Sequence, residues 1–194
     1  MCIKSSPAGL LVAAAALLLP PAASAHHSFA ASFQVDTIIE LRKRQIAHKV
    51  MVIGDGPARG WFEKALPGGI FAGFKTGKEL GRALASGDIF FNPSITETFG
   101  NVTLEAMACG LPVVAADATG SSSLVAHGES GMLVQPGDVK GFADALAPYC
   151  LDADLRARHG AAGLERSQPY TWEAINASMV DTYLRLLEAR TAAR

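Results

Sequence analysis

From residue 36 onward the apolar positions of this chain alternate between two patterns. Short continuous apolar runs recur, and each is followed by a stretch whose apolar residues have helical spacing. A continuous apolar run indicates a strand buried on both faces, and spacing of three or four residues indicates a helix with one buried side. The predicted strands are Lys49–Gly54, Ile70–Gly73, Ile89–Phe91, Pro112–Ala116 and Met132–Val134.

Helical spacing separates these strands. The predicted helices are one that contains Ile38 and Leu41, a short one around Trp61 and Phe62, and those at about 79–86, 101–108, 120–126, 139–149, 152–166 and 172–190. Strands that each precede a helix predict a parallel sheet. The fold class expected is therefore α/β, a Rossmann-like parallel sheet with helices on both faces.

Length and charge narrow the possible functions. The chain has 194 residues, 49% of them hydrophobic and 18% charged, which suits one packed domain. Lysine and arginine (17) nearly balance aspartate and glutamate (18), so the sequence does not favour a nucleic-acid partner. We interpret the basic cluster Arg42–Arg44 as the end of a helix, where positive charge is favourable. Cys109 and Cys150 look like small buried residues.

The first 25 residues have the pattern of a secretory signal peptide. Lys4 precedes an apolar run, Ala8–Leu19, and an Ala-x-Ala site predicts cleavage after Ala25. The run is shorter than the roughly 20 residues that span a membrane. Residues 26–35 are expected to be a flexible remnant, in which His26 and His27 alone are weak evidence for a metal site.

Candidate chemistry lies where the predicted strands end. Ligands of open parallel sheets bind outside the carboxyl ends of the strands. Three such ends are glycine-rich or polar: Gly54–Pro57, Gly73–Lys75 and Asn92–Gly100. A helix that begins after Gly100 would direct amide groups and its positive dipole end toward the same edge, which favours phosphate.

Two glutamates flank that helix start. Glu97 and Glu105 would repel phosphate but could accept hydrogen bonds from hydroxyl groups on either side of it. A diphosphate between two polyhydroxylated rings, as in a nucleotide sugar, fits this arrangement. The pattern also has simpler explanations, because a glutamate near a helix start is mildly stabilising by itself and GDGP could be only a turn.

Longer stretches carry a family resemblance. VIGDGPAR, FAGF, ASGDIFFNPSITETFGNVTLEAMACGLPVVAA and SGMLVQPGD, in this order, resemble the C-terminal half of retaining glycosyltransferases of family four, which have the two-domain GT-B fold. The resemblance runs from about Val35 to the C-terminus. It implies a single domain over residues 36–194 that binds a nucleotide sugar and belongs to an enzyme that transfers a hexose to a hydroxyl acceptor with retention.

The resemblance also implies roles for individual residues. Glu97 would be the catalytic-site residue that contacts the donor sugar, and Glu105 would bind the ribose hydroxyls. The backbone at Phe99, Gly100 and Asn101 would face the sugar and the diphosphate. The nucleotide and its base would be flanked by Gly54, Asp55, Gly56, Gly73 and Phe74.

Donor and cofactor follow from the same family. The wording ETFGNVTLEAMA is most similar to bacterial mannosyltransferases that use a GDP-sugar, while UDP-sugar enzymes share most of it. The implied donor is therefore GDP- or UDP-linked. No metal is expected, because the resemblance implies a metal-independent family. His127 is expected to be a surface residue.

Several departures from the family leave the activity of this chain open. The first strand of the domain, the diphosphate-binding arginine and lysine that follow it, and the acceptor-binding domain have no match in the sequence. The family resemblance implies the cytoplasm, where nucleotide sugars are made, whereas the leader points to the periplasm or secretion. A leader joined to half of a transferase, by fusion, truncation or a gene-calling error, would explain both. A lipid acceptor or an uncleaved leader would bring the chain to a membrane.

Two alternatives compete with an inactive fragment. One is an exported α/β binding module without enzymatic activity, and the other is a donor half that complements a separate acceptor domain. The last helix bears on this choice. Its apolar stripe could pack on this domain or, as in the two-domain family, cross onto the other domain. The stripe comprises Trp172, Ile175, Met179, Tyr183, Leu186 and Leu187.

Overall fold

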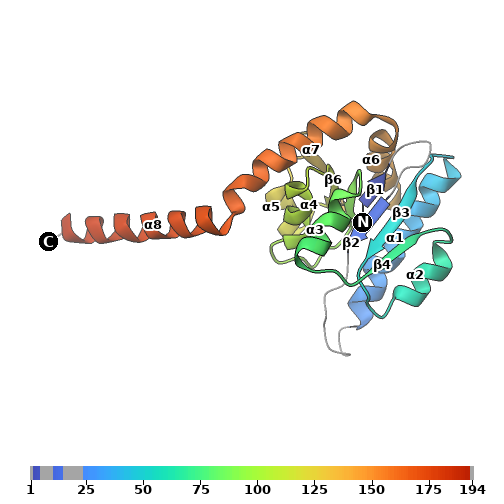
Figure 1. The fold of residues 1–194 in the computed structure, drawn as a ribbon, viewed down its shortest axis with the longest axis horizontal. Helices are drawn as coiled ribbons and strands as arrows, with labels where there is room; N and C mark the ends of the chain where they lie inside the picture. Colours follow the sequence, from blue (N-terminus) through green and yellow to red (C-terminus); the bar gives the residue numbers. More distant parts are fainter. Residues whose placement is uncertain (1, 5–10, 15–23, 193–194) are drawn as a thin grey trace.

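The computed structural model describes residues 2–4, 11–14 and 24–192, and it has the α/β architecture expected from the sequence (Figure 1). The strands are β1 (Cys2–Lys4), β2 (Leu11–Ala14), β3 (Lys49–Ile53), β4 (Ile70–Gly73), β5 (Phe90–Asn92), β6 (Val113–Ala116) and β7 (Gly131–Val134). The helices are α1 (Ser24–Lys43), α2 (Arg59–Ala65), α3 (Gly77–Ala85), α4 (Asn101–Ala108), α5 (Thr119–Leu124), α6 (Val139–Leu151), α7 (Ala153–Ser167) and α8 (Trp172–Ala192), with a 3-10 turn, η2 (Gln168–Tyr170).

One sheet joins all the strands of the described residues. Its order is β4-β3-β1-β2-β5-β6-β7, with further pairings of β2 with β3 and of β1 with β5. Every pairing among β2 to β7 is parallel, whereas β1 pairs antiparallel with β2, β3 and β5. The carboxyl ends of the parallel strands therefore lie along a single edge of the sheet.

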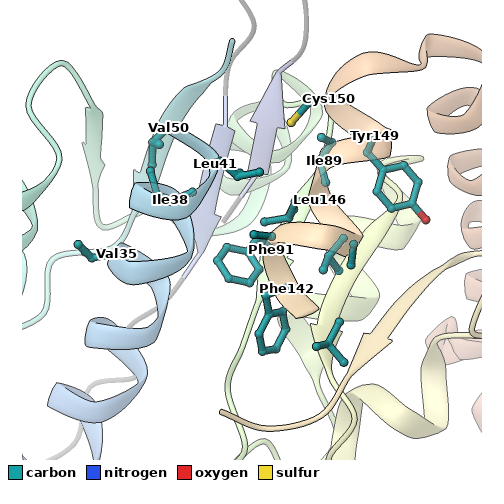
Figure 2. Close-up of a cluster of buried hydrophobic side chains, with 14 of the residues drawn as sticks. Val35, Ile38, Leu41, Val50, Ile89, Phe91, Phe142, Leu146, Tyr149 and Cys150 are labelled. Carbon is teal, nitrogen blue, oxygen red and sulfur yellow. The ribbon is translucent and has the colours of Figure 1, made fainter. Parts of the chain in front are cut away.

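Each face of the sheet has its own core. Alternate residues of β3, β5 and β6 point to opposite faces, so Val52, Phe91 and Val114 join one cluster while Ile53, Phe90 and Val113 join the other. Helices α1, α2 and α6 cover the first face, and α3, α4 and α5 cover the second. Figure 2 shows the first cluster, in which the rings of Phe91 and Phe142 lie 5.4 Å apart between centroids.

The N-terminal segments take part in this arrangement. β2 lies within the apolar run that we interpreted as part of a signal peptide, and it pairs with both β3 and β5. It therefore lies in the interior of the sheet. Helix α1 begins at Ser24 and includes residues 26–35, which we expected to be a flexible remnant. Residues 1, 5–10 and 15–23 of the predicted leader lie outside the described residues.

The basic cluster at the end of α1 lies at the opposite edge from the strand carboxyl ends. Arg42 and Lys43 occupy the last turn of α1, as predicted. Arg44 forms an ion pair with Asp144 of α6 at 2.6 Å, and Arg42 donates a hydrogen bond to the Pro67 carbonyl. These side chains hold α1 against its neighbours.

Helix α8 leaves the body of the molecule (Figure 1). Its apolar stripe is exposed to solvent, with Trp172 77% and Tyr183 61% accessible. The alternative in which this stripe packs on the core of the same domain is therefore wrong. Among the described residues, no helix is sufficiently long and apolar to cross a membrane.

Candidate functional site

The loops after β3 and β4 meet at the carboxyl edge of the sheet. The backbone N–H of Gly54 donates a hydrogen bond to the Gly73 carbonyl at 2.9 Å, which joins the two glycine-rich segments directly. Gly73 has φ of 71° and Gly54 has φ of 133°, values that favour glycine. The structure therefore brings together the two segments that the sequence analysis assigned to the nucleotide, and Phe74 extends from them with 54% of its surface exposed.

An arginine holds the first of these loops in place. Arg59, at the start of α2, donates hydrogen bonds to Asp55 and Glu63, both at 2.8 Å. The hydrogen bond to Asp55 is the main reason that the pKa of Arg59 is raised. The two ion pairs of Arg59 therefore join the Asp55 turn to the first turns of α2. Sequence analysis missed this role, although the spacing of four residues on each side of Arg59 is its signal.

The third loop follows β5 and leads into α4. Gly100 caps α4 in the left-handed conformation, with φ of 90°, and among the described residues no side chain caps this end. The first amides of a helix have no partner within the helix, so those at the start of α4 are available to a ligand. The predicted start of this helix at Asn101 is confirmed.

A buried polar chain underlies this loop. The Asn92 side-chain amide donates to the Thr103 hydroxyl at 3.5 Å, and the Thr103 and Ser121 hydroxyls share a hydrogen bond at 3.1 Å. All three residues are almost completely buried. The side-chain oxygen Oδ1 of Asn92 also accepts a hydrogen bond from the Ser94 N–H, at the start of the loop. The chain thus fixes β5, α4 and α5 to one another beneath the candidate site.

The two glutamates lie on either side of the first turn of α4, Glu97 before it and Glu105 after it. Glu97 is half-buried in the loop, and its carbonyl accepts a hydrogen bond from the Gly120 N–H at 3.0 Å. Glu105 lies in the second turn of α4, where partial burial raises the pKa of its carboxyl. Its charge also helps to raise the pKa of the Cys109 thiol, after the larger effect of burial. Both glutamates belong to the same loop and helix, and their contacts with a donor remain predictions.

An aromatic contact links the loop to the end of the chain. The rings of Phe99 and Tyr170 lie 5.7 Å apart between centroids, and Tyr170 belongs to η2, between α7 and α8. Helix α7 also packs against α4 and α5. Its Gly163 lies close to Met107 of α4, since a Cβ on Gly163 would be 3.7 Å from that side chain. Its Arg166 donates a hydrogen bond to the Leu124 carbonyl of α5. Sequence analysis did not identify this support.

Other candidate residues lie away from this loop. His127 is exposed, as predicted, and its ring nitrogen accepts a hydrogen bond from the Leu133 N–H. Cys150 is buried, as predicted, whereas Cys109 is only half-buried. Across the part of the chain that the structure describes, no three histidine, cysteine, aspartate or glutamate side chains gather as ligands for a metal ion.

Comparison with protein families gives one match over most of the chain. The family model described as "Glycosyl transferases group 1" matches residues 22–152, which include the loops after β3, β4 and β5 and helix α4. The match also includes α1, so the similarity begins upstream of the Val35 boundary inferred from the sequence.

Individual relatives agree with the family model. The chain is 41% identical over 131 residues to sulfoquinovosyl transferase SQD2 of Arabidopsis thaliana, covering 65% of this chain and 26% of that protein. It is 37% identical over 145 residues to a GDP-mannose-dependent alpha-mannosyltransferase of Mycolicibacterium smegmatis, covering 74% and 38%. The chain thus spans well under half the length of these curated relatives.

A solved structure has the same fold. HepE of Anabaena, crystallised in complex with UDP-glucose, superimposes with a TM-score of 0.69 at 25% sequence identity. The match covers 91% of this chain and 48% of HepE. One half of a longer protein therefore has the architecture described above.

Proposed function

Because the chain belongs to the glycosyl transferases group 1 family, we propose that it binds the donor of a hexosyl transfer. The donor is a nucleoside diphosphate sugar, and the reaction passes its hexose to a hydroxyl acceptor with retention at the anomeric carbon. The observation that carries the proposal is the convergence of the Gly54 and Gly73 loops and the uncapped start of α4 at one edge of a parallel sheet.

The diphosphate lies at the start of α4 in this proposal. Amides of the first helical turn and the positive end of the helix dipole attract negative charge. The left-handed Gly100 supports this role, because a side chain at that position would be strained and would press against α5, which would displace the start of α4. The leaving diphosphate is neutralised by these groups, with no metal ion.

The glutamates bind the sugar rings on either side. Glu97 contacts the donor hexose and is the catalytic-site residue, and Glu105 accepts hydrogen bonds from the ribose hydroxyls. The position of Glu105 in the second turn of α4, one turn beyond the proposed diphosphate site, supports this assignment. The base lies against the Gly54–Gly56 turn and Gly73–Phe74.

Both GDP- and UDP-linked donors fit the proposal. The name of one relative specifies GDP-mannose, and the HepE structure was solved with UDP-glucose. The backbone groups that face the base in the proposal discriminate weakly between bases, so direct titration is needed to choose between them.

Transfer requires a second partner in this proposal. The chain spans 26% to 38% of the two curated relatives, so an acceptor-binding domain completes the cleft. We expect the chain alone to bind the donor weakly and to transfer no sugar. Donor supply places this function in the cytoplasm, where nucleotide sugars are made.

Calorimetric titration with UDP, GDP, UDP-glucose and GDP-mannose tests the proposal. Glu105→Ala should weaken binding of the preferred nucleotide by about 1–3 kcal/mol, because the ribose hydroxyls lose a charged acceptor. Glu165→Ala, an exposed glutamate on α7, is the matched control and should bind like the wild type. If the wild type binds none of the four ligands, the proposed function is wrong, and if Glu105→Ala binds unchanged, the role of Glu105 is wrong.

A further inference from the structure

Gly120, at the start of α5, lies against the peptide bond between Phe99 and Gly100. A Cβ atom added to Gly120 would lie 2.4 Å from the Phe99 carbonyl carbon and 2.5 Å from the Gly100 nitrogen. These are backbone atoms, so no side-chain rotation relieves the overlap. The two segments can approach this closely only because residue 120 has no side chain.

Two further contacts hold the same segment. The Gly120 N–H donates to the Glu97 carbonyl at 3.0 Å, so the loop is held at both Glu97 and the Phe99–Gly100 peptide. Gly100 faces the same contact from the other side, because a Cβ on it would lie 3.3 Å from the Gly120 carbonyl carbon and from the Leu124 side chain. The backbone of α5 therefore sets the height of the loop above the sheet.

The start of α5 is itself fixed to α4. The Ser121 hydroxyl, next to Gly120, shares a hydrogen bond with the buried Thr103 hydroxyl at 3.1 Å. Ser121 is 1% exposed and Thr103 is fully buried, so water does not compete for this bond. The Ser121–Thr103 hydrogen bond therefore fixes the backbone of Gly120, and Gly120 in turn fixes the Phe99–Gly100 peptide of the loop.

We propose that Gly120 is a positioning residue for the donor site, which holds the amides of residues 99–101 at the height that a diphosphate requires. This inference rests on the proposed donor function. Gly120 touches no ligand in this account and acts only through the backbone of the loop. A shift of the loop by about 1 Å would misalign those amides, a displacement that typically costs a large factor in binding or rate.

Gly120→Ala tests the inference by separating the diphosphate from the nucleoside. Its affinity for UDP or GDP should fall about tenfold to a hundredfold, while its affinity for uridine or guanosine stays within about twofold. Gly81→Ala is the matched control, because Gly81 also lies in a helix and a Cβ there meets nothing within 4 Å. Hydrogen exchange of the amides at residues 100 and 101 should accelerate in Gly120→Ala, with sheet amides unchanged.

Ser121→Ala keeps the inference testable if Gly120→Ala does not fold. It removes the bond to Thr103 without a steric clash, and UDP or GDP affinity should fall about twofold to fivefold. The inference is wrong, and the proposed function stands, if the wild type binds UDP or GDP and both folded variants bind them equally well. It is also wrong if Gly120→Ala loses affinity for the nucleoside and for the nucleoside diphosphate by the same factor. An unchanged affinity in Ser121→Ala alone also overturns it when Gly120→Ala is unfolded. If the wild type binds no nucleotide, the proposed function fails and this inference fails with it.

Discussion

Helix α7 supports α4 through two glycines that should respond to alanine in opposite directions. A Cβ on Gly160 would stand 2.1 Å from the Gly110 carbonyl oxygen, just after α4. A Cβ on Gly163 would lie 3.7 Å from both Leu111 and Met107, an ordinary contact. The two positions share one helix and one type of substitution, so local propensity is the same and only the space differs.

The expected magnitudes follow from these distances. Alanine is favoured over glycine in a helix by about 1 kcal/mol, a gain that both variants share. Gly160→Ala must also move α7 or the Gly110 backbone by about 1 Å. Overpacking costs about 1–3 kcal/mol, and a clash with a backbone oxygen lies at the upper end of that range, about 2–3 kcal/mol. Because a carbonyl oxygen cannot rotate away, we expect a net loss of about 1–2 kcal/mol for Gly160→Ala. Gly163→Ala should gain about 0.5–1 kcal/mol.

Urea denaturation followed by circular dichroism measures the difference. Both variants should keep the wild-type dependence of the unfolding free energy on urea, and their midpoints should shift in opposite directions. A Gly160→Ala variant as stable as the wild type would show that α7 does not pack on Gly110 at the distance described. A destabilised Gly163→Ala variant would contradict the ordinary contact with Met107.

Two further predictions concern titratable side chains. Burial lowers the pKa of His48 below its ordinary value of 6.5, so the folded state binds fewer protons than the unfolded state, and the free energy of unfolding should fall as pH drops below about 6.5. Urea titrations at pH 7 and pH 5 should show a smaller fall in His48→Asn than in the wild type, and an equal fall in both would contradict this cause. Burial raises the pKa of Cys150 to about 12 and raises that of Cys109 less, so iodoacetamide at pH 8 should label Cys109 faster than Cys150, as peptide mapping by mass spectrometry measures. Faster labelling of Cys150 would show that it is not buried in the native chain.

Much of the fold could be predicted because its strands are continuous apolar runs. β3, β6 and β7 lie within one residue of their predicted bounds, since both faces of each strand are buried and no polar position blurs the pattern. β5 also lies within one residue of its predicted bounds, but it is shifted by one residue so that it ends at Asn92. This buried polar residue belongs to the strand because its amide bonds Thr103, a partner that the local pattern does not reveal.

The N-terminal region shows where local pattern is insufficient. An apolar run rich in alanine and leucine is compatible with a leader, a strand or a helix, and only pairing with β3 and β5 distinguishes the strand. The stripe on α8 was likewise identified correctly, but periodicity specifies only which residues share a face. What that face contacts depends on surfaces elsewhere.

The candidate site divides in the same way. Glycines and carboxylates at strand ends could be placed at one edge from the topology alone, because parallel strands end on the same side. The contacts that support the site could not be predicted from the sequence. Phe99 is distant in sequence from Gly120 and from Tyr170, and it meets them only after α5 and α7 pack. The local sequence ATGSSS does not show whether its glycine allows close backbone packing or only occupies a turn.

The position of β2 gives the first residues of this chain two incompatible fates. Leu11–Ala14 lies between β3 and β5, in the interior of the sheet, so a peptidase that cut after Ala25 would withdraw a central strand and separate the two halves that it joins. Under the hypothesis of an export leader, those residues would be needed for translocation before folding, whereas folding buries them in the sheet. Under that hypothesis, the faster of the two events would decide whether the sheet keeps or loses its central strand.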